Sequence, residues 1–488
     1  MPQAIASRLA GNGPGRPPES SWAGLDALLH PRAVAVVGAS DNPDRIGGVP
    51  LALMRERGFA GRLIPVNPKY STVQGLSAFP SLVAAGGEID VAIVAVPAAA
   101  LESALDDAIA AHVKTLVIFS SGLAESGELG RNLQEKLALR AHAAGIRVLG
   151  PNCLGMMSFQ DKVYATFSPA PRAGENRTGD IAIVSQSGAF GAFAFSLARA
   201  RELGMSYWIT TGNEADIEFA DCVQWLAQDG KTRVILGYME GCRDTSRLER
   251  ALQAAREAGK RVVITKVGRT AAGAAAAAAH TGADTGDDAA YDALFRRHGV
   301  WRASTVEELF TVGYAASVCP LPASARTGLL TVSGGVGILM ADEASSAGLD
   351  LDEMPQRAQQ ALLKEVPYAG PRNPVDITGQ ALTTPGLLER TLANMLGTQD
   401  GQAGYDMLLF FPAAALLGAA IARKVVDELI AAHARHPDRP FVVTGLMQPA
   451  YRQAFREAGV AVIDDPSAAV RALAALAFFA QSARTPAV

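Results

Sequence analysis

The chain has 488 residues, of which 49% are hydrophobic and 19% are charged, and its net charge is −4. This length corresponds to about three domains of a globular protein. The weak acidity argues against nucleic acid or an acidic membrane as a partner, and no apolar run approaches the roughly 18 residues of a membrane span.

The chain begins with residues 1–22, which lack the apolar core of a signal peptide and are expected to form a flexible lead-in. Four cysteines are scattered without metal-ligand spacing: Cys153, Cys222, Cys242 and Cys319. We interpret them as buried thiols, which predicts a cytoplasmic, reducing compartment and no metal site.

Short apolar runs that alternate with helical segments fill the first third of the chain. The run "RAVAVV" at residues 32–37 leads into the small residues Gly38, Ala39 and Ser40. Further strands are predicted at residues 62–66, 90–96, 115–120 and 146–150. Runs of this length and composition are typical of strands buried on both faces of a parallel sheet.

The rest of the chain repeats this pattern twice. The run "DIAIVS" at residues 180–185 leads into Gln186, Ser187 and Gly188, and "TGLLTV" at residues 327–332 leads into Ser333, Gly334 and Gly335. The other predicted strands lie at residues 206–211, 233–240, 261–267, 406–411, 440–445 and 460–464.

This alternation predicts an α/β protein made of three consecutive parallel-sheet domains with right-handed crossovers. We place the domains at residues 23–155, 156–320 and 325–485, because "CPLPASART" at residues 319–327 has the composition of a linker. Each domain contains a strand, a turn of small residues and then a helix. The helix N-terminus offers unpaired N–H groups, so the turn suits a phosphate-bearing ligand.

A dinucleotide-binding Rossmann domain is one alternative for the first turn. The turn "GASDNPDRIGG" at residues 38–48 lacks the G-x-G-x-x-G spacing, however. The next strand ends in Asn67-Pro68, where an acidic residue would bind the ribose. These two features argue against a dehydrogenase.

Nine short motifs follow one another along the chain: "VAVVGAS", "PVNPK", "VAIVAVP", "FSSGLAE", "GPNCLG", "VSQSGA", "TTGNEADI", "HTG" and "RNPVDITG". In this order they resemble the NDP-forming acyl-CoA synthetases, which are related to the α subunit of succinyl-CoA synthetase. The resemblance extends from about Ala23 to Gln481. It implies a Rossmann-like CoA-binding domain followed by two flavodoxin-like domains.

The resemblance also implies site residues. His280 matches the histidine that is phosphorylated in the family, and Glu240 matches the glutamate that pairs with it. Ser187 and Gly188 match the helix N-terminus that holds the phosphate. The residues implied for CoA binding are Gly38, Ala39, Ser40, Asn67, Pro68, Lys69, Val96 and Pro97.

His280 stands in "GRTAAGAAAAAAHTGADTGDD" at residues 268–288, where almost every residue is small. We expect residues 271–286 to form a mobile loop on which the histidine carries a phosphoryl group between two sites. An imidazole is largely neutral at pH 7 and can attack phosphorus. A surface histidine in an alanine-rich helix is the alternative.

The implied activity is that of an ADP-forming acid–CoA ligase. Such an enzyme interconverts acyl-CoA, phosphate and ADP with a small carboxylic acid, CoA and ATP through an acyl phosphate and a phosphohistidine. No segment of the chain can be assigned to an ATP-grasp domain, so ATP or ADP with Mg²⁺ is expected on a separate ATP-grasp β subunit. The assembly would be a homo- or hetero-oligomer.

Two departures from the family pattern flank the histidine. Ala279 replaces the usual serine, and Asp284 and Thr285 interrupt the glycine-rich tract after it. An added negative charge near a phosphate-accepting histidine would slow transfer. These departures and the missing ATP-grasp domain leave an alternative open, a catalytically silent regulatory protein that binds CoA or acyl-CoA.

Overall fold

The computed structural model describes residues 22–281, 285–398 and 401–485. The chain divides into two compact units. The first unit comprises residues 1–175, 186–192 and 208–225, and the second comprises residues 176–185, 193–207 and 226–488.

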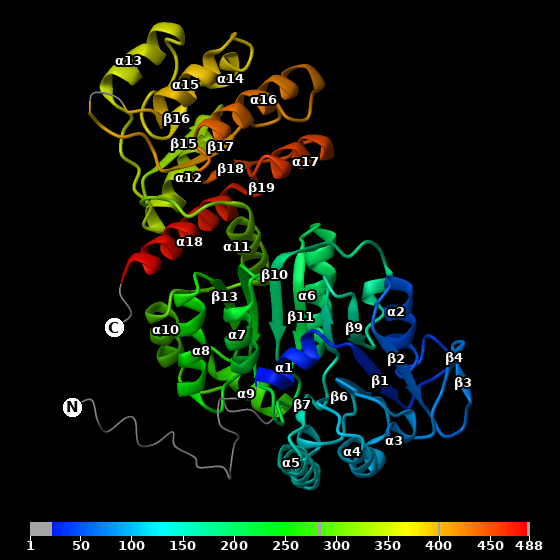
Figure 1. The fold of residues 1–488 in the computed structure, drawn as a ribbon. Helices are drawn as coiled ribbons and strands as arrows, with labels where there is room; N and C mark the ends of the chain where they lie inside the picture. Colours follow the sequence, from blue (N-terminus) through cyan, green and yellow to red (C-terminus); the bar gives the residue numbers. More distant parts are fainter. Residues whose placement is uncertain (1–21, 282–284, 399–400, 486–488) are drawn as a thin grey trace, which may run out of the picture. The chain divides into compact units, whose positions relative to one another are not determined.

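The first unit contains a five-stranded parallel sheet with the order β2-β1-β5-β6-β7 (Figure 1). Its strands are β1 (Ala33–Val37), β2 (Arg62–Val66), β5 (Val91–Val94), β6 (Thr115–Ile118) and β7 (Arg147–Leu149). The chain runs from β1 to β2 on one side and then crosses to β5 on the other. Open α/β sheets bind ligands at such a switch point, at the carboxyl ends of the strands.

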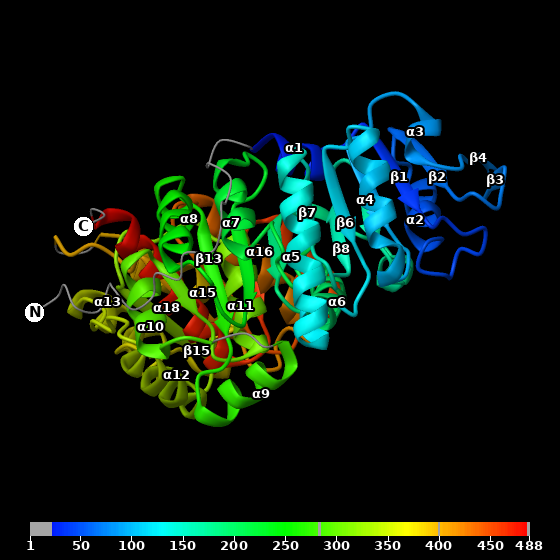
Figure 2. The same ribbon diagram turned by 90° about the horizontal axis from the view of Figure 1, so that it is seen from below.

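Helices α3 (Leu82–Ala85), α4 (Leu101–Ala110) and α5 (Glu128–Ala143) pack on this sheet through a core of small and branched apolar side chains. The unit also contains α1 (Trp22–Leu29) and α2 (Val49–Arg57). Helices α4 and α5 lie side by side in both views (Figure 2). Two antiparallel hairpins complete the unit, β3 (Thr72–Val73) with β4 (Leu76–Ser77) and β8 (Gly155–Ser158) with β9 (Val163–Thr166).

The second unit contains two further sheets. In the first, β14, β13, β12 and β10 follow one another in this order and pair in parallel. Its strands are β10 (Thr178–Ser185), β11 (Met205–Thr210), β12 (Val234–Met239), β13 (Arg261–Lys266) and β14 (Val300–Arg302). The helices along this stretch are α6 (Gly188–Ala200), α7 (Phe219–Gln228), α8 (Thr245–Glu257), α9 (Ala271–Thr281), α10 (Asp288–Arg297) and α11 (Val306–Val318). The end of β11, the start of α6 and most of α7 belong to the first unit.

The last sheet is parallel and has the order β16-β15-β17-β18-β19. Its strands are β15 (Thr327–Thr331), β16 (Val375–Asp376), β17 (Met407–Phe411), β18 (Phe441–Thr444) and β19 (Ala461–Ile463). The helices are α12 (Gly334–Ser346), α13 (Gln356–Glu365), α14 (Thr378–Ala381), α15 (Leu387–Leu396), α16 (Ala419–Arg435), α17 (Pro449–Glu457) and α18 (Pro466–Arg484). Within the second unit, α18 packs against both α11 and α12 and so connects the two sheets.

The predicted α/β fold of three consecutive sheets is confirmed, and every strand predicted from the sequence is present within two residues at each end. The prediction of a mobile loop at residues 271–286 is wrong for its first part, because Ala271–Thr281 forms helix α9. Alanine has the highest helix propensity, and this outweighs the flexibility of the single Gly273. All four cysteines are thiols, and all but Cys242 are buried.

Candidate functional site

The turn after β1 is packed so closely that two positions require glycine. Gly38 has a φ of 84°, and a Cβ atom there would lie 2.5 Å from the carbonyl oxygen of Ala95. A Cβ atom at Gly47 would lie 2.1 Å from the carbonyl oxygen of Gly38. The two glycines therefore let neighbouring backbone segments pack against one another and fix the shape of the turn.

The peptide N–H groups of this turn already have partners within the fold. Those of Gly38 and Ala39 donate to the carbonyl oxygen of Val66 at 3.0 and 3.2 Å, and that of Ser40 donates to Gly47 at 3.3 Å. Residues 41–48 then separate the turn from α2. A phosphate at the turn would therefore meet the Ser40 side chain and the loop before it met a helix N-terminus.

The other residues implied for CoA follow neighbouring strands. The Asn67 side chain donates to the carbonyl oxygen of Ala39 at 2.8 Å, which ties the end of β2 to the end of β1. Ser120, after β6, donates from its hydroxyl to the carbonyl oxygen of Val96 at 2.5 Å, which ties β6 to β5. The structure thus brings one set of residues together at the carboxyl edge of the sheet: Gly38, Ala39, Ser40, Asn67, Pro68, Lys69, Val96 and Pro97.

The second turn is a capped helix N-terminus. The Ser187 hydroxyl accepts a hydrogen bond from the Phe190 N–H at 3.2 Å, and the Ser187 carbonyl accepts one from Gly191 at 2.9 Å. These are the bonds of an N-cap residue. Ser187 and Gly188 therefore lie where the sequence predicts them, at the positive end of the 13-residue helix α6.

A cluster of polar side chains in the first unit was not predicted. The Asn213 amide donates to Glu125 Oε2 at 2.5 Å and to Gln134 Oε1 at 3.0 Å, and the Asn152 amide donates to Asn213 Oδ1 at 3.2 Å. Burial opposes ionisation of Glu125, but hydrogen bonds from Asn213 and nearby backbone hold its pKa below the usual value. The cluster joins the motifs "FSSGLAE", "GPNCLG" and "TTGNEADI".

Glu240 and His280 both belong to the second unit. Glu240 directly follows β12 and is 7% exposed. Burial raises the pKa of the neighbouring Tyr238, and the charge of Glu240 adds to this. His280 lies in α9, but its side chain and Asp284 lie outside the described part of the chain, so the pairing of His280 with Glu240 stays a prediction.

The segment that carries His280 leaves and re-enters the fold at one place. Gly268 has a φ of 74°, and a Cβ atom there would lie 2.5 Å from Cγ2 of Thr285. Lys266, at the end of β13, is 1% exposed, and its Nζ lies 4.7 Å from the ring centroid of Tyr291 in α10. These contacts hold residues 266–268 against residues 285–291.

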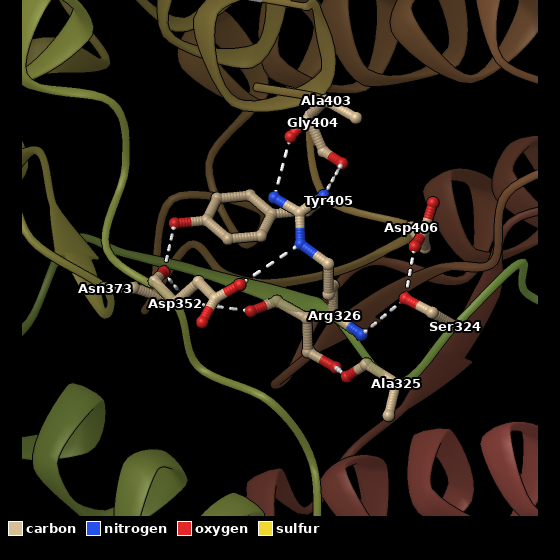
Figure 3. A network of polar contacts seen from close by, with 10 residues as sticks. Ser324, Ala325, Arg326, Asp352, Asn373, Ala403, Gly404, Tyr405 and Asp406 are labelled. Atoms are coloured by element: carbon tan, nitrogen blue, oxygen red, sulfur yellow. Dashed lines mark hydrogen bonds and ion pairs between the residues drawn. The ribbon is translucent and has the colours of Figure 1, made fainter. Parts of the chain in front are cut away.

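The third turn, at residues 333–335, starts helix α12, and a polar network lies at the other end of β15 (Figure 3). The network converges on Asp352, whose carbonyl accepts from the Tyr405 hydroxyl at 2.7 Å and from the Asn373 amide at 3.2 Å. The Arg326 side chain donates to the Asp352 carboxylate at 3.2 Å. This network stabilises the amino end of the sheet, so Asn373 of "RNPVDITG" has a structural role here.

Neither a metal-binding cluster nor a membrane-spanning helix is found among the described residues. No group of three or more His, Cys, Asp or Glu side chains among them could hold a metal ion. No helix in the same part of the chain is long and apolar enough to cross a membrane.

Comparison with protein families matches three domain models along the chain. Residues 32–158 match a CoA binding domain, residues 178–316 match a succinyl-CoA ligase like flavodoxin domain, and residues 327–451 match a ligase-CoA domain. The first two matches each contain one sheet, and the third contains the last sheet except its edge strand β19.

Two known proteins resemble the chain over most of its length. The α subunit of acetate–CoA ligase [ADP-forming] I from Pyrococcus furiosus is 32% identical over 93% of this chain and 97% of that protein. The α subunit of acetate–CoA ligase [ADP-forming] II from the same organism is 34% identical over 73% of this chain and 77% of that protein.

A solved structure gives the same result. The dinucleotide forming acetyl-coenzyme A synthetase 1 of Ca. Korarchaeum cryptofilum, in complex with phosphate and ADP, has a TM-score of 0.83 and 31% identity. The match covers 94% of this chain and 97% of that one. The chain therefore belongs to the family of ADP-forming acyl-CoA synthetases and has the domains of their α subunits.

Proposed function

We propose that the chain is the CoA-binding, phosphohistidine-bearing α-type subunit of an ADP-forming acid–CoA ligase. The enzyme interconverts acyl-CoA, phosphate and ADP with a carboxylic acid, CoA and ATP. The observation that carries the proposal is the pair of turns in the first unit, one of close-packed glycines and one a capped helix N-terminus, in a chain of this family.

The first unit would bind CoA and phosphate. We assign CoA to the carboxyl edge of the sheet, with its pyrophosphate near Gly38, Ala39 and Ser40. Phosphate, or the phosphoryl end of an acyl phosphate, is assigned to the N-terminus of α6 at Ser187 and Gly188. A helix N-terminus binds an anion without a buried counter-charge.

The second unit would accept the phosphoryl group. A ring nitrogen of His280 forms a bond to phosphorus while the bond from phosphorus to the acyl oxygen breaks, and the carboxylate leaves with the electron pair. We assign Glu240 to the other ring nitrogen, where a carboxylate orients the ring and stabilises the cation that forms.

The nucleotide half of the reaction is assigned to a partner chain. The relatives that match over most of their length are named as α subunits, and the chain spans about half (51%) of the acetate–CoA ligase [ADP-forming] I of Archaeoglobus fulgidus. We propose a separate ATP-grasp β subunit that binds ADP or ATP with Mg²⁺ in a cytoplasmic hetero-oligomer. Acetate is the first acid to test, because the relatives are named for it.

Intact mass after incubation with acetyl phosphate tests the proposal. The chain should gain one phosphoryl group that is lost in acid, and the His280→Ala variant should gain none. A chain that binds CoA but gains no phosphoryl group from acetyl phosphate, or from acetyl-CoA with phosphate, would be the regulatory protein instead.

A further inference from the structure

Glu214, in the motif "TTGNEADI", has no part in the reaction outlined above, yet it is held at a conformational cost. It is 7% exposed, and its φ of 54° lies in the left-handed region that residues with a Cβ atom rarely adopt. Buried charges and left-handed backbone persist where the surroundings fix them, and they cluster at functional sites. The contacts of Glu214 show what it fixes.

One carboxylate oxygen of Glu214 serves the local fold. Oε1 accepts from the Thr211 hydroxyl at 2.8 Å and from the N–H of Phe219 at 2.9 Å. Phe219 is the first residue of α7. The positive end of this helix therefore compensates the buried charge.

The other oxygen reaches the turn that precedes α6. Oε2 accepts from Nε2 of Gln186 at 3.0 Å. A carboxylate is an acceptor only, so Gln186 must present its NH₂ group to Glu214, and this fixes the orientation of the whole amide. Gln186 directly precedes Ser187, which caps the start of α6 at Gly188.

We propose that Glu214 is a positioning residue for phosphate binding. Through Gln186 it holds the turn at residues 186–188 in the conformation that receives phosphate or the phosphoryl end of an acyl phosphate. This inference rests on the proposed function of that turn. The Glu214 carboxylate contacts Gln186, and we place Gln186 between Glu214 and the anion.

The Glu214→Gln variant keeps the size of the side chain but replaces one acceptor oxygen by an NH₂ donor. If its oxygen still accepts from Thr211 and Phe219, its NH₂ group faces the NH₂ of Gln186, and the Gln186 amide must turn over. We expect calorimetry to show affinity for inorganic phosphate at least 10-fold lower. The rate of His280 phosphorylation by acetyl phosphate should fall about 10- to 100-fold, the scale of a misplaced binding group.

Asp221→Asn is the matched control. Asp221 is also buried near the start of α7, where it accepts from the Glu218 N–H at 2.9 Å and lies 3.7 Å from the Arg147 guanidinium. It should change phosphate affinity less than 2-fold.

A charge swap separates positioning from simple stabilisation. In the double variant Glu214→Gln with Gln186→Glu, the hydrogen bond re-forms with its polarity reversed, so the melting temperature should recover. Phosphate affinity should stay low, because a carboxylate now adjoins the anion. If phosphate affinity recovered together with the melting temperature, residue 186 would not adjoin the anion.

The outcomes distinguish this inference from the proposed function. Parent-like phosphate affinity in Glu214→Gln, or its recovery in the charge swap, would overturn the positioning role. If the parent binds phosphate and His280 is never phosphorylated, the proposed function fails, while the phosphate titrations still decide the role of Glu214. A parent that binds no phosphate overturns both.

Discussion

At the carboxyl edge of the first sheet, the turn around Ser40 is closely packed and should not tolerate a larger side chain. Ser40 lies beside Gly47 and Gly48, where added Cβ atoms would lie 2.1 and 1.9 Å from backbone oxygens. Replacing Ser40 by Glu should block CoA by bulk and by like charge, with at least a 100-fold loss of affinity in calorimetry. Ser103→Glu, on the exposed side of α4, is the control. Unchanged CoA affinity in Ser40→Glu would refute the placement of the pyrophosphate.

Glu240 is expected to act through the charge that forms on His280. The Glu240→Gln variant should keep the fold and slow phosphorylation of His280 by about 10- to 100-fold, because the imidazolium loses its partner. Quenched-flow phosphorylation by acetyl phosphate measures this. Glu257→Gln, at the exposed end of α8, should match the parent. Equal rates in the two variants would show that Glu240 is only a strand-end acid.

The sequence predicts residues that follow strands better than residues that pair across the fold. Gly38, Asn67 and Ser187 each come after an apolar run, so their place at a strand end could be predicted. The bond between Gln186 and Glu214 joins residues 28 positions apart and needs a left-handed backbone at Glu214. No local pattern predicts either feature.

At the scale of elements, two glycines in the histidine segment should respond in opposite ways. In Gly268→Ala the new methyl group would clash with Thr285, and alanine disfavours the positive φ at this position. The variant should therefore destabilise the contact of residues 266–268 with residues 285–291 by about 1–2 kcal/mol and slow phosphorylation. Gly273→Ala has its nearest neighbour at 3.4 Å and should stabilise α9 by about 0.5–1 kcal/mol. Hydrogen exchange of α9 measures both effects. Equal exchange in the two variants would contradict the helix and its anchored base.

His433 in helix α16 should make the free energy of unfolding of the last domain depend on pH. Burial, with a smaller effect of His436, lowers the pKa of His433 below its usual 6.5. Below pH 6.5 the unfolded chain binds a proton that the folded chain refuses, so the free energy of unfolding should fall as the pH falls toward 5. Urea titrations at pH 7.5 and 5.5 measure this loss. His433→Leu should reduce it, and an unchanged loss would exclude His433 as its source.

Strands were predicted well where they lie in continuous runs of branched apolar residues. The missed strands β3, β4, β8, β9, β14 and β16 have two to four residues each and do not form such runs. The helix α9 was missed for a different reason. Its residues are small enough for either a loop or a helix, and intrinsic propensity decides between them.

At the scale of the whole molecule, the proposed function assigns CoA, an acyl phosphate and a phosphorylated histidine to this chain. Transfer to ADP needs Mg²⁺ and cationic groups that neutralise charge as it develops. We have assigned these to an ATP-grasp partner. The chain should therefore complete one half of the reaction and stop.

Transfer from the phosphorylated chain to ADP shows directly whether the activity is divided in this way. The purified 488-residue chain is phosphorylated with acetyl phosphate, freed of excess donor and mixed with ADP and Mg²⁺, with His280→Ala as the inactive control. We expect the phosphoryl group to stay on His280 until an ATP-grasp subunit is added, and then to appear in ATP. Formation of ATP by the chain alone, absent in His280→Ala, would contradict the account.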